Sequence, residues 1–577
     1  MREIYTRCTM ILARNREFEN RMVSTTDELV FVPLGGIGEI GMNAGLYGYG
    51  TKKNRRWLLV DCGIAFAGEE LPGIDIIMPD LAFLEAQRDR LEAIVITHAH
   101  EDHIGALMDL WPKLRAPVYA TRFAASLLEI RKFNEPGAQK IPIHTVEVAE
   151  RYQFGPFDVE FVPMAHSIPE STGLAIRTPL GMVFHSGDWK IDETPFVGWK
   201  TDEKRIRELG EEGVLAFVSD STNVVRDGIS PSESEVAQSL KDIIAASTGR
   251  VAVTTFASNV ARIRAVAEAA AACGREVIAV GRAMDRVIEV AKESGYLDGL
   301  PDFRSVDVYG YLPRDKVVAL ITGSQGEPRA ALARIAEGNH PDMTLTAGDK
   351  VIFSSRAIPG NEKGISKLIN KLVEQGIEVM TDRDGLVHVS GHPRRGEMER
   401  MYSWVKPHIS IPAHGEALHL EEHRKLAKKM GVAHAIRIHN GQMVRIAPGK
   451  PEMFDAVKVG RIYKDGSLLI PQADPAVSER RRLSNAGIVS VAMAIDAKGL
   501  LVGDVALAVF GLPQTSVSGQ SFEDIVEEAI FSVLDTLPKA KMRDPDTVET
   551  AVERAIRSQV NQNWGKKPNC HVQVVAV

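Results

Sequence analysis

Short apolar segments dominate the chain between residues 29 and 225, and many of them are rich in β-branched side chains. They cover 29–34, 57–60, 93–97, 159–162, 182–185 and 214–219. Helical periodicity in this range is clearest at 104–114 and 121–133. These patterns predict sheets flanked by outer helices, in which the polar residues at strand ends meet along one edge.

The pattern changes between 228 and 385, where helices and strands alternate regularly. Predicted helices cover 232–247, 259–272, 284–294, 328–337 and 362–375, and predicted strands cover 250–255, 276–280, 317–321, 350–353 and 377–380. Such alternation favours a parallel, doubly wound α/β sheet and therefore a separate domain. Strands at 387–390 and 408–411 then bring further histidines to strand ends, which predicts that the middle domain is an insertion.

These patterns divide the chain into six parts. We expect an N-terminal extension at 1–27, a first domain in two parts at 28–225 and 386–455, the insertion at 226–385, a linker at 456–475 and a small C-terminal α/β domain at 476–577. The last domain is defined by strands at 487–496, 501–510 and 571–577 and by helices at 521–537 and 546–560. Met22 is an alternative candidate for the translation start.

Composition narrows the class of protein. Hydrophobic residues make up 44% and charged residues 25% of the 577 residues, as in folded soluble domains. No apolar run approaches the roughly 18 residues of a membrane span, and the N-terminus lacks the apolar region of a signal peptide. We therefore expect a cytoplasmic protein with no membrane partner. Because the four cysteines are scattered, any metal must be held by histidine and carboxylate.

The formal net charge of −7 argues mildly against a protein that coats nucleic acid, although it allows a local basic groove. Arginines cluster between 250 and 282 and again at Arg394 and Arg395. Solvated helix faces are the ordinary interpretation of such clusters, so they serve here only as support.

The strongest chemical signal is the H-x-H-x-D-H motif at 98–103, directly after the apolar strand 91–96. On an extended strand end His98 and His100 point the same way, while Asp102 and His103 begin the next helix and turn toward the same space. One zinc ion cannot use all four groups and keep a position open for water, whereas two ions can if other strands supply ligands. Three candidates each lie a few residues past a predicted strand, namely His166, Asp188 and His414.

A second motif, G-x-G-x-x-G at 36–41, imitates a dinucleotide-binding fingerprint, with Asp61 further along the chain. That fingerprint needs a helix directly after the glycines. The following residues, MNAGLYGYGTKKN, predict a strand and a turn instead. A nicotinamide site is therefore disfavoured.

The motifs resemble those of the metallo-β-lactamase superfamily, with Asp61 in LLVDCG beside the histidine motif, His166, Asp188 and a distal histidine. SDSTN with Asp220, SGHP with His392 and PAHGE with His414 are similar to its nucleic-acid-processing β-CASP branch. From LGGIGEIGMN through TGSQGEP, IPGNE and SGHPRRGE, residues 29–577 are most similar to the bacterial ribonuclease J family. The implied fold is an αββα sandwich with an inserted, doubly wound β-CASP domain and a small C-terminal α/β domain.

The resemblance implies two zinc ions per subunit, with manganese or magnesium as alternatives. One ion would be held by His98, His100 and His166, the other by Asp102, His103 and His414, and Asp188 would bridge them. The implied catalytic residues are Asp61, Asp188, Asp220 and His392. Asp61 would support a ligand from outside, and His392, oriented by Asp220, would donate to the phosphate or the leaving oxygen.

The implied substrate loop consists of His388, Val389, Ser390, Gly391 and His392. A hydroxyl and an unhindered N–H suit phosphate oxygens there. Ser258 and Asn259, at the start of a predicted helix, are a second candidate by the anion affinity of helix N-termini, with simple N-capping as the alternative.

The expected activity is hydrolysis of RNA, as a 5′→3′ exonuclease that prefers 5′-monophosphate ends and also cuts internally, in rRNA processing and mRNA decay. Single-stranded RNA is the expected partner, with assembly into a homodimer or homotetramer through the C-terminal domain. The alternatives are a single-stranded DNA nuclease of the same branch and a small-molecule metallohydrolase. A metal-free interaction subunit is disfavoured, because all seven ligand positions are filled.

Overall fold

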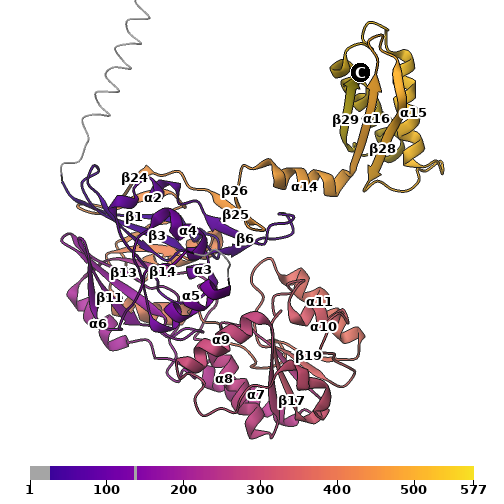
Figure 1. Cartoon of the computed structure of the whole chain (residues 1–577). Helices are drawn as coiled ribbons and strands as arrows, with labels where there is room; N and C mark the ends of the chain where they lie inside the picture. The colour runs from indigo at the N-terminus through magenta and orange to yellow at the C-terminus, as the bar shows by residue number, and fades with distance from the viewer. Residues whose placement is uncertain (1–25, 135–138) are drawn as a thin grey trace, which may run out of the picture. The chain divides into compact units, whose positions relative to one another are not determined.

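The computed structural model describes residues 26–134 and 139–577, which form two compact units (Figure 1). The first unit contains the described residues up to Phe66 together with Ile76–Ile462, and the second contains Ala67–Asp75 and Tyr463–Val577. The predicted extension at 1–27, including Met22, lies almost entirely outside the described residues. Within the described ranges, no helix is both long and apolar enough to cross a membrane.

Two sheets face each other in the first unit. The first has the order β24 (Glu452–Ala456), β23 (Gln442–Ala447), β1 (Glu28–Gly35), β3 (Ala44–Gly50), β4 (Arg56–Val60), β7 (Leu91–Val95), β8 (Val118–Ala120), β9 (Ile143–Thr145). The second has the order β10 (Arg151–Phe154), β11 (Phe157–Pro163), β12 (Thr172–Thr178), β13 (Gly181–His185), β14 (Val214–Asp220), β20 (Ile409–Ala413), β22 (His434–Ala435). Alternate residues of both sheets, such as Leu58 and Ile176, share one buried core.

Helices cover both outer faces of this sandwich. Three helices, α6 (Glu203–Glu212), α12 (Arg395–Val405) and α13 (Ala417–Lys429), pack on the second sheet through a separate apolar cluster that includes Ile206, Met401 and Leu426. Helices α4 (Leu107–Leu114) and α5 (Arg122–Asn134) connect the parallel pairs β7–β8 and β8–β9, so they cross the outer face of the first sheet. The predicted αββα sandwich is confirmed.

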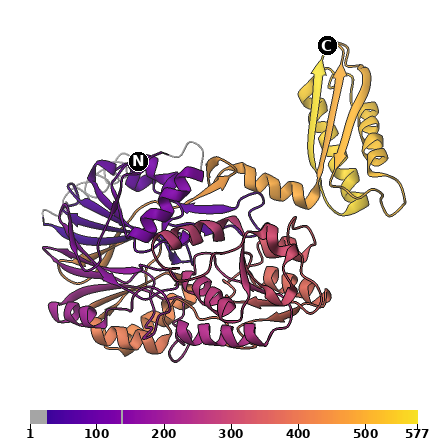
Figure 2. The ribbon, with the colours of Figure 1, turned by 60° about the horizontal axis from the view of Figure 1, so that its bottom comes forward.

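The chain leaves the second sheet after β14 and returns at β20, its parallel neighbour. Between them lies a five-stranded parallel sheet in the order β16 (Glu276–Val280), β17 (Val317–Ile321), β15 (Val251–Thr254), β18 (Lys350–Phe353), β19 (Glu378–Met380). Five helices alternate with its strands: α7 (Glu233–Ala246), α8 (Val260–Ala272), α9 (Arg282–Glu293), α10 (Ala331–Ala336) and α11 (Glu362–Glu374). Every residue of β15 and β17 is buried, as a sheet covered on both faces requires. The doubly wound insertion is thus confirmed (Figure 2), while its domain boundaries stay a prediction.

The structure differs from the sequence pattern in three places. The predicted strand at 387–390 is wrong: Val387 and Val389 are buried in alternation, but no neighbouring strand pairs with this described segment. The predicted helix at 104–114 is divided into α3 (Glu101–Ile104) and α4. The segment expected to be a linker, 456–475, contains the short strands β25 (Arg461–Asp465) and β26 (Leu468–Pro471).

The second unit contains a three-stranded sheet in which β27 (Ile488–Ile495) lies between β28 (Leu501–Phe510) and β29 (Asn569–Ala576). Helices α15 (Phe522–Thr536) and α16 (Pro545–Trp564) cover one face of this sheet through a core that includes Val491, Ile530 and Ile556. The elements expected for this domain are present. Helix α14 (Pro475–Ala486) was not expected, although Asp474 caps it and Pro475 begins it, which is a readable start signal.

Candidate metal centre

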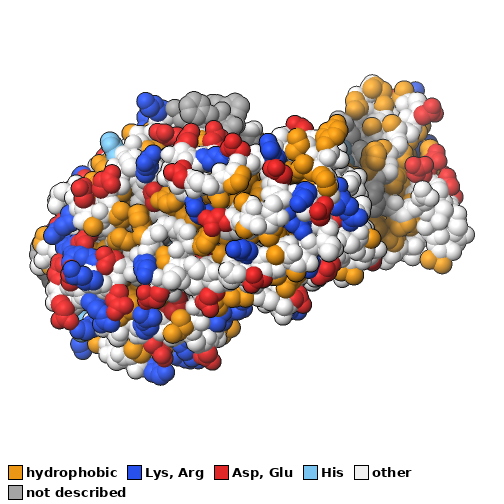
Figure 3. Space-filling view, turned by 90° about the horizontal axis from the view of Figure 1, so that it is seen from below, with side chains coloured by type: hydrophobic (Ala, Val, Ile, Leu, Met, Phe, Trp, Pro, Cys, Tyr) orange, Lys and Arg blue, Asp and Glu red, His pale blue; other side chains and the backbone are white. Residues whose placement is uncertain are grey.

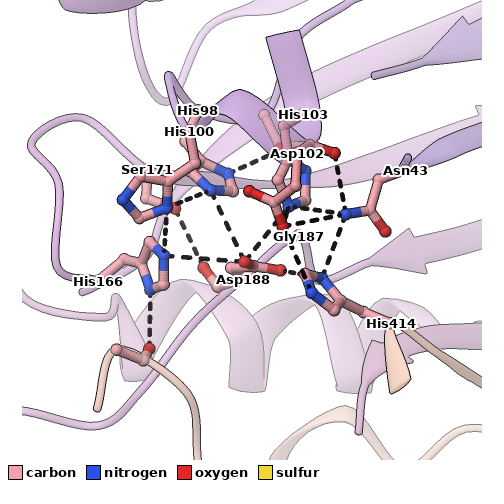
Figure 4. A network of polar contacts seen from close by, with 12 residues as sticks. Asn43, His98, His100, Asp102, His103, His166, Ser171, Gly187, Asp188 and His414 are labelled. Atoms are coloured by element: carbon pink, nitrogen blue, oxygen red, sulfur yellow. Dashed lines mark hydrogen bonds and ion pairs between the residues drawn. The ribbon is translucent and has the colours of Figure 1, made fainter. Parts of the chain in front are cut away.

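The seven predicted ligand side chains lie together at one edge of the sandwich, where strands of both sheets end (Figure 4). The H-x-H-x-D-H motif leaves β7 and turns into α3, and the other ligands follow β11, β13 and β20. They form two clusters that share one residue. The members are His98, His100, His166 and Asp188 in the first cluster and Asp102, His103, Asp188 and His414 in the second.

In the first cluster, three imidazole nitrogens converge on one point. His100 Nδ1 lies 3.1 Å from His98 Nε2 and 3.0 Å from His166 Nε2. Asp188 Oδ2 lies 3.7 Å from both of those Nε2 atoms. Nitrogen lone pairs converge in this way on a metal ion, and the set of three imidazoles and one carboxylate is a zinc ligand set.

In the second cluster, Asp188 contributes both of its oxygens. Its Oδ2 lies 3.3 Å from His103 Nε2, and its Oδ1 lies 2.8 Å from His414 Nδ1. Asp102 Oδ2 lies 3.5 Å from the Nε2 atoms of both His103 and His414. Asp188 therefore sits between the two clusters, where a carboxylate can bind two ions at once.

Unsatisfied buried atoms support a metal here. Asp188 Oδ1 and His414 Nε2 are buried and have no partner with hydrogen-bond geometry among the described residues. Oδ1 does lie 2.8 Å from His414 Nδ1, which is an ion-pair distance, but without the geometry of a hydrogen bond. Buried polar atoms of this kind call for an explanation, and coordination supplies one. The residues present therefore fit two metal ions.

Hydrogen bonds to acceptors outside the two clusters fix which ring nitrogen of His103 and of His166 faces the cluster. His103 Nδ1 donates to Asp61 Oδ2 at 2.7 Å, which leaves its Nε2 toward the cluster. Asp61 is itself held by the backbone N–H and the hydroxyl of Thr97, both at 2.8 Å. His166 Nδ1 donates to the carbonyl oxygen of Gly391 at 2.7 Å. Asp61 thus accepts from the predicted ligand His103 and belongs to neither cluster, which agrees with the role that the resemblance implies.

Two glycines permit the close approach of the ligand segments. A Cβ on Gly63 would lie 1.6 Å from the carbonyl oxygen of Asp102, and a Cβ on Gly391 would lie 2.6 Å from His166 Nδ1. Any side chain at either position would displace the backbone of Asp102 or the ring of His166, which are both predicted ligands.

Asn43 belongs to the site but was not predicted. Its amide nitrogen lies 3.1 Å from the carbonyl oxygen of Asp102, 3.1 Å from His103 Nε2 and 3.4 Å from His414 Nδ1 (Figure 4). It follows the glycine-rich segment 36–41, which continues into strand β3 and not into a helix, so the dinucleotide fingerprint is excluded. The only sequence signal was its position two residues after Gly41, the last glycine of that segment.

Burial and charge give the histidines different proton affinities. Burial lowers the pKa of His98 and His166 well below the usual value, with further lowering by neighbouring imidazoles, and lowers that of His100 to about 4. These rings are neutral at pH 7, as metal ligation requires. Burial also opposes the charged form of Asp188, yet His414 and His103 keep the pKa of this carboxyl well below its usual range.

Asp220 and His392 form a pair beside the metal clusters. Asp220, at the end of β14, accepts from His392 Nδ1 at 2.7 Å, and Thr222 holds its other oxygen through the backbone N–H at 2.8 Å. His392 Nδ1 is also 3.8 Å from Asp188 Oδ2. Burial would lower the pKa of His392, but Asp220 and Asp188 raise it to about 9. Asp220 thus binds the His392 ring through Nδ1 and leaves Nε2 available for another contact.

Asn223 holds the predicted substrate loop at 388–392 through its side-chain amide. Asn223 Nδ2 donates to Ser390 Oγ at 2.9 Å and to the carbonyl oxygen of His392 at 3.2 Å. The side chain of Val389 is 3% exposed and belongs to the core, so only its backbone is available to a ligand. His388 is half-buried, and its Nδ1 has no hydrogen-bond partner among the described residues.

Ser258 and Asn259 precede helix α8. Asn259 is 2% exposed, and its side chain accepts from the backbone N–H of Arg262 at 2.9 Å, which is the N-capping role considered as the alternative. Within the described residues, no side-chain contact joins Ser258 or Asn259 to the loop at 388–392. Arg262 makes that connection through a 2.7 Å hydrogen bond from Nη1 to the carbonyl oxygen of Val387.

Fold and site together define a metal-dependent hydrolase of the metallo-β-lactamase class. Four family models match consecutive parts of the chain. They are a beta-lactamase superfamily domain at 56–201, the ribonuclease J beta-CASP domain at 248–372, a Zn-dependent metallo-hydrolase RNA specificity domain at 376–439 and the ribonuclease J C-terminal domain at 475–577.

Similarity to individual proteins extends over nearly the whole length. The chain is 52% identical to ribonuclease J of Sinorhizobium meliloti over 96% of this chain and 98% of the relative. It is 38% identical to ribonuclease J of Mycolicibacterium smegmatis over 93% and 95%, and 35% identical to that of Synechocystis over 88% and 79%. The chain belongs to the ribonuclease J family.

A solved structure agrees on the fold alone. The crystal structure of a protein of unknown function from Enterococcus faecalis V583 matches 72% of this chain and 100% of its own, with a TM-score of 0.50 and 15% identity.

Proposed function

We propose that this chain is a ribonuclease that hydrolyses phosphodiester bonds with two metal ions, zinc being the expected metal. The observation that carries the proposal is Asp188, whose two oxygens face two separate ligand clusters while His392 stands beside it. Histidine with carboxylate suits zinc and accepts manganese, with magnesium less well matched because it prefers oxygen ligands.

Bound metal would supply an activated water and would stabilise negative charge on the phosphate. One ion would be held by His98, His100 and His166, the other by Asp102, His103 and His414, with Asp188 common to both. The chain's own residues do the rest. Asp61 keeps His103 in the ligating tautomer through the 2.7 Å hydrogen bond. Asp220 holds the His392 ring at Nδ1, so His392 Nε2–H can donate to a phosphate oxygen or to the leaving oxygen.

The loop at 388–392 is suited to a terminal phosphate. Burial lowers the pKa of His388 well below its usual value, and the positive charges of Arg262, Arg356 and Lys190 lower it further. A cationic surrounding of this kind favours an anion beside the ring. The Ser390 hydroxyl and the Gly391 backbone belong to the same loop. We assign the 5′-monophosphate to this loop, and with it 5′→3′ exonucleolysis accompanied by internal cutting.

We propose that copies of the chain assemble through the second unit. The face of its sheet that α15 and α16 do not cover exposes apolar side chains, including Phe510 at 65%, Val502 at 46% and Val575 at 49%. Hydrophobic side chains are visible on the surface of this part of the chain (Figure 3). A second copy of the chain would bury them, giving a homodimer or homotetramer.

We further place the enzyme in the cytoplasm, in rRNA processing and mRNA decay.

The test is a time course on RNA and single-stranded DNA of one sequence, each with a 5′-monophosphate, triphosphate or hydroxyl end. We expect RNA with a monophosphate to shorten fastest from its 5′ end, and a chelator to stop the reaction. His392→Ala should abolish turnover, whereas His439→Ala, an exposed histidine outside the clusters, should not. Equal cutting of DNA, or full activity with chelator, would overturn the proposal.

A further inference from the structure

Three arginines outside the metal clusters lie on segments that are bonded to the loop at 388–392 and its neighbour Val387, or that continue this loop. They are Arg226, Arg356 and Arg394, called here the arginine cluster. Each lies within three residues of a residue that forms a hydrogen bond to the loop or to Val387, or of a loop residue itself. Arg394, for example, is two residues after His392. Arg226 follows Asn223, which donates to Ser390, and Arg356 follows Ser354, whose hydroxyl donates to the carbonyl oxygen of Val387 at 2.7 Å.

The backbone fixes the segments that carry two members of the cluster. The N–H of Arg395 donates to the carbonyl oxygen of Arg226 at 2.9 Å, and the N–H of Gly396 donates to that of Gly228 at 2.9 Å. Arg394 Nη1 also donates to the carbonyl oxygen of Ile229 at 3.4 Å. Arg226 and Arg394 are therefore held close to each other by the fold.

Negative charge in the cluster is insufficient to balance three guanidinium groups. Asp382 pairs with Arg356 at 3.4 Å, and among the described residues no carboxylate forms an ion pair with the guanidinium group of Arg226 or Arg394. Of the Arg394 donors, only the backbone N–H bonds to Glu397, at 2.9 Å. Arg395, the next residue, has its own partner in Asp227 at 3.4 Å. Burial lowers the pKa of Arg226 and the charge of Arg394 lowers it further, while Asp382 acts in the opposite direction. Like charges held together in this way are stabilised by an anion.

We infer that the arginine cluster binds phosphodiester groups of the RNA strand next to the loop at 388–392. The inference rests on the proposed ribonuclease function and adds a second contact region to it. Arg226 and Arg394 are half-buried and their guanidinium groups have no carboxylate partner among the described residues, so they can donate charge-assisted hydrogen bonds to phosphate oxygens. Because such contacts ignore the bases, the cluster would hold any sequence while the strand advances.

The test measures the affinity of the metal-loaded enzyme for a hydrolysis-resistant RNA by fluorescence anisotropy at several salt concentrations. For Arg226→Gln and Arg394→Gln we expect roughly fivefold weaker binding each, and a salt slope smaller by about 0.7 per arginine removed. Arg226→Lys should keep most of the slope. The matched control is Arg207→Gln, which removes the same charge from α6, where Arg207 already pairs with Glu203 at 2.8 Å. It should bind as the wild type does.

Two arms separate the outcomes. Equal weakening for RNA with 5′-monophosphate and 5′-hydroxyl ends supports backbone binding, whereas weakening confined to monophosphate ends overturns it in favour of a terminal-phosphate contact. Wild-type binding and slope in both glutamine variants also overturn the inference. Binding by the wild type without any cutting of normal RNA would instead defeat the proposed function and leave the arginine cluster standing.

Discussion

Arg262 Nη1 donates to the carbonyl oxygen of Val387 across 2.7 Å, which ties helix α8 of the insertion to the loop that carries His388 and His392. The same guanidinium pairs with Glu233 at 2.8 Å through Nη2, and both residues are almost fully buried. Lys190, two residues after Asp188, lies 3.8 Å from the other oxygen of Glu233. A buried chain of charges thus connects the segment after Asp188, the insertion and the loop at 388–392.

This connection predicts a coupled loss in Arg262→Met. Removing the guanidinium leaves Glu233 charged with a weaker partner and leaves Val387 without that donor, so we expect about 3 kcal/mol less stability. RNA turnover should fall at least about tenfold, because loop placement within a fraction of an ångström matters for turnover. Urea unfolding and an RNA time course measure the two effects.

The double variant Arg262→Met with Glu233→Gln is the control for that prediction. Because it removes both charges, it should lose less stability than the sum of the two single variants. Strictly additive losses would show that the two side chains do not act as a pair.

Gly391→Ala should weaken metal binding. The new methyl group would lie 2.5 Å from His166 Cε1 and 2.6 Å from Nδ1, so the ring or the loop must move. Because the carbonyl of Gly391 also orients that ring, we expect metal affinity to fall by about 10- to 100-fold, with turnover falling alongside. Competition with a chromophoric chelator measures the affinity.

Gly310→Ala is the matched control, since nothing lies within 4 Å of a Cβ at that exposed position. It should bind metal as the wild type does. If Gly391→Ala also keeps full metal affinity, the close packing of the loop against His166 does not contribute to metal binding.

Metal content should separate the roles of Asp188 and His392. We expect two metal equivalents per chain in the wild type, almost none in Asp188→Ala and two in His392→Ala, while both variants lose RNA turnover. Elemental analysis of the purified proteins gives the counts. A single equivalent in the wild type would contradict the two clusters as separate sites, and metal loss in His392→Ala would contradict its role toward the phosphate.

Much of the metal centre was predictable because its geometry is local. In H-x-H-x-D-H, covalent spacing and the change from strand to helix alone bring four side chains together. His166, Asp188 and His414 followed from their positions after β11, β13 and β20. These strands all run in one direction, so their carboxyl ends lie at one edge of the sheet. The same reasoning predicts nothing about Asn43. Its approach to His103 depends on a backbone contact between distant segments, in which the N–H of Gly63 donates to the carbonyl oxygen of Asn43 at 3.0 Å.

Long-range polar contacts were the part that sequence could not supply. Arg262 and Val387 are far apart in the chain, and a single arginine in a helical pattern carries no sign of its partner. The false strand at 387–390 has a related cause. Its alternating burial resembles a strand, yet the carbonyl of Val387 is bonded by Arg262 and Ser354 side chains where a neighbouring strand would otherwise be.

The last prediction concerns stability at acid pH and the buried carboxylate of Glu160 on β11. Its side chain is 4% exposed and accepts from Arg205 Nε at 2.6 Å and Nη2 at 3.0 Å, with Arg177 Nη2 at 2.9 Å. Burial would raise the pKa of this carboxyl, but the two arginines lower it below the usual 4.5. Its contribution is therefore complete above pH 4.5 and is lost as the pH falls through the lower folded-state value.

Glu160→Gln should lose about 2 kcal/mol at neutral pH, because Arg177 and Arg205 lose their buried carboxylate partner and keep only the more exposed Glu212 and Glu208. Below pH 4.5 the gap to the wild type should narrow, since protonation then weakens the same ion pairs in the wild type. Urea unfolding between pH 3 and 7 measures this, because urea, unlike guanidinium, does not screen charges. Glu211→Gln, which removes an exposed partner of Lys406, should leave the curve unchanged. A gap between wild type and Glu160→Gln that stays constant down to pH 3 would show that the charge of Glu160 is not what stabilises β11.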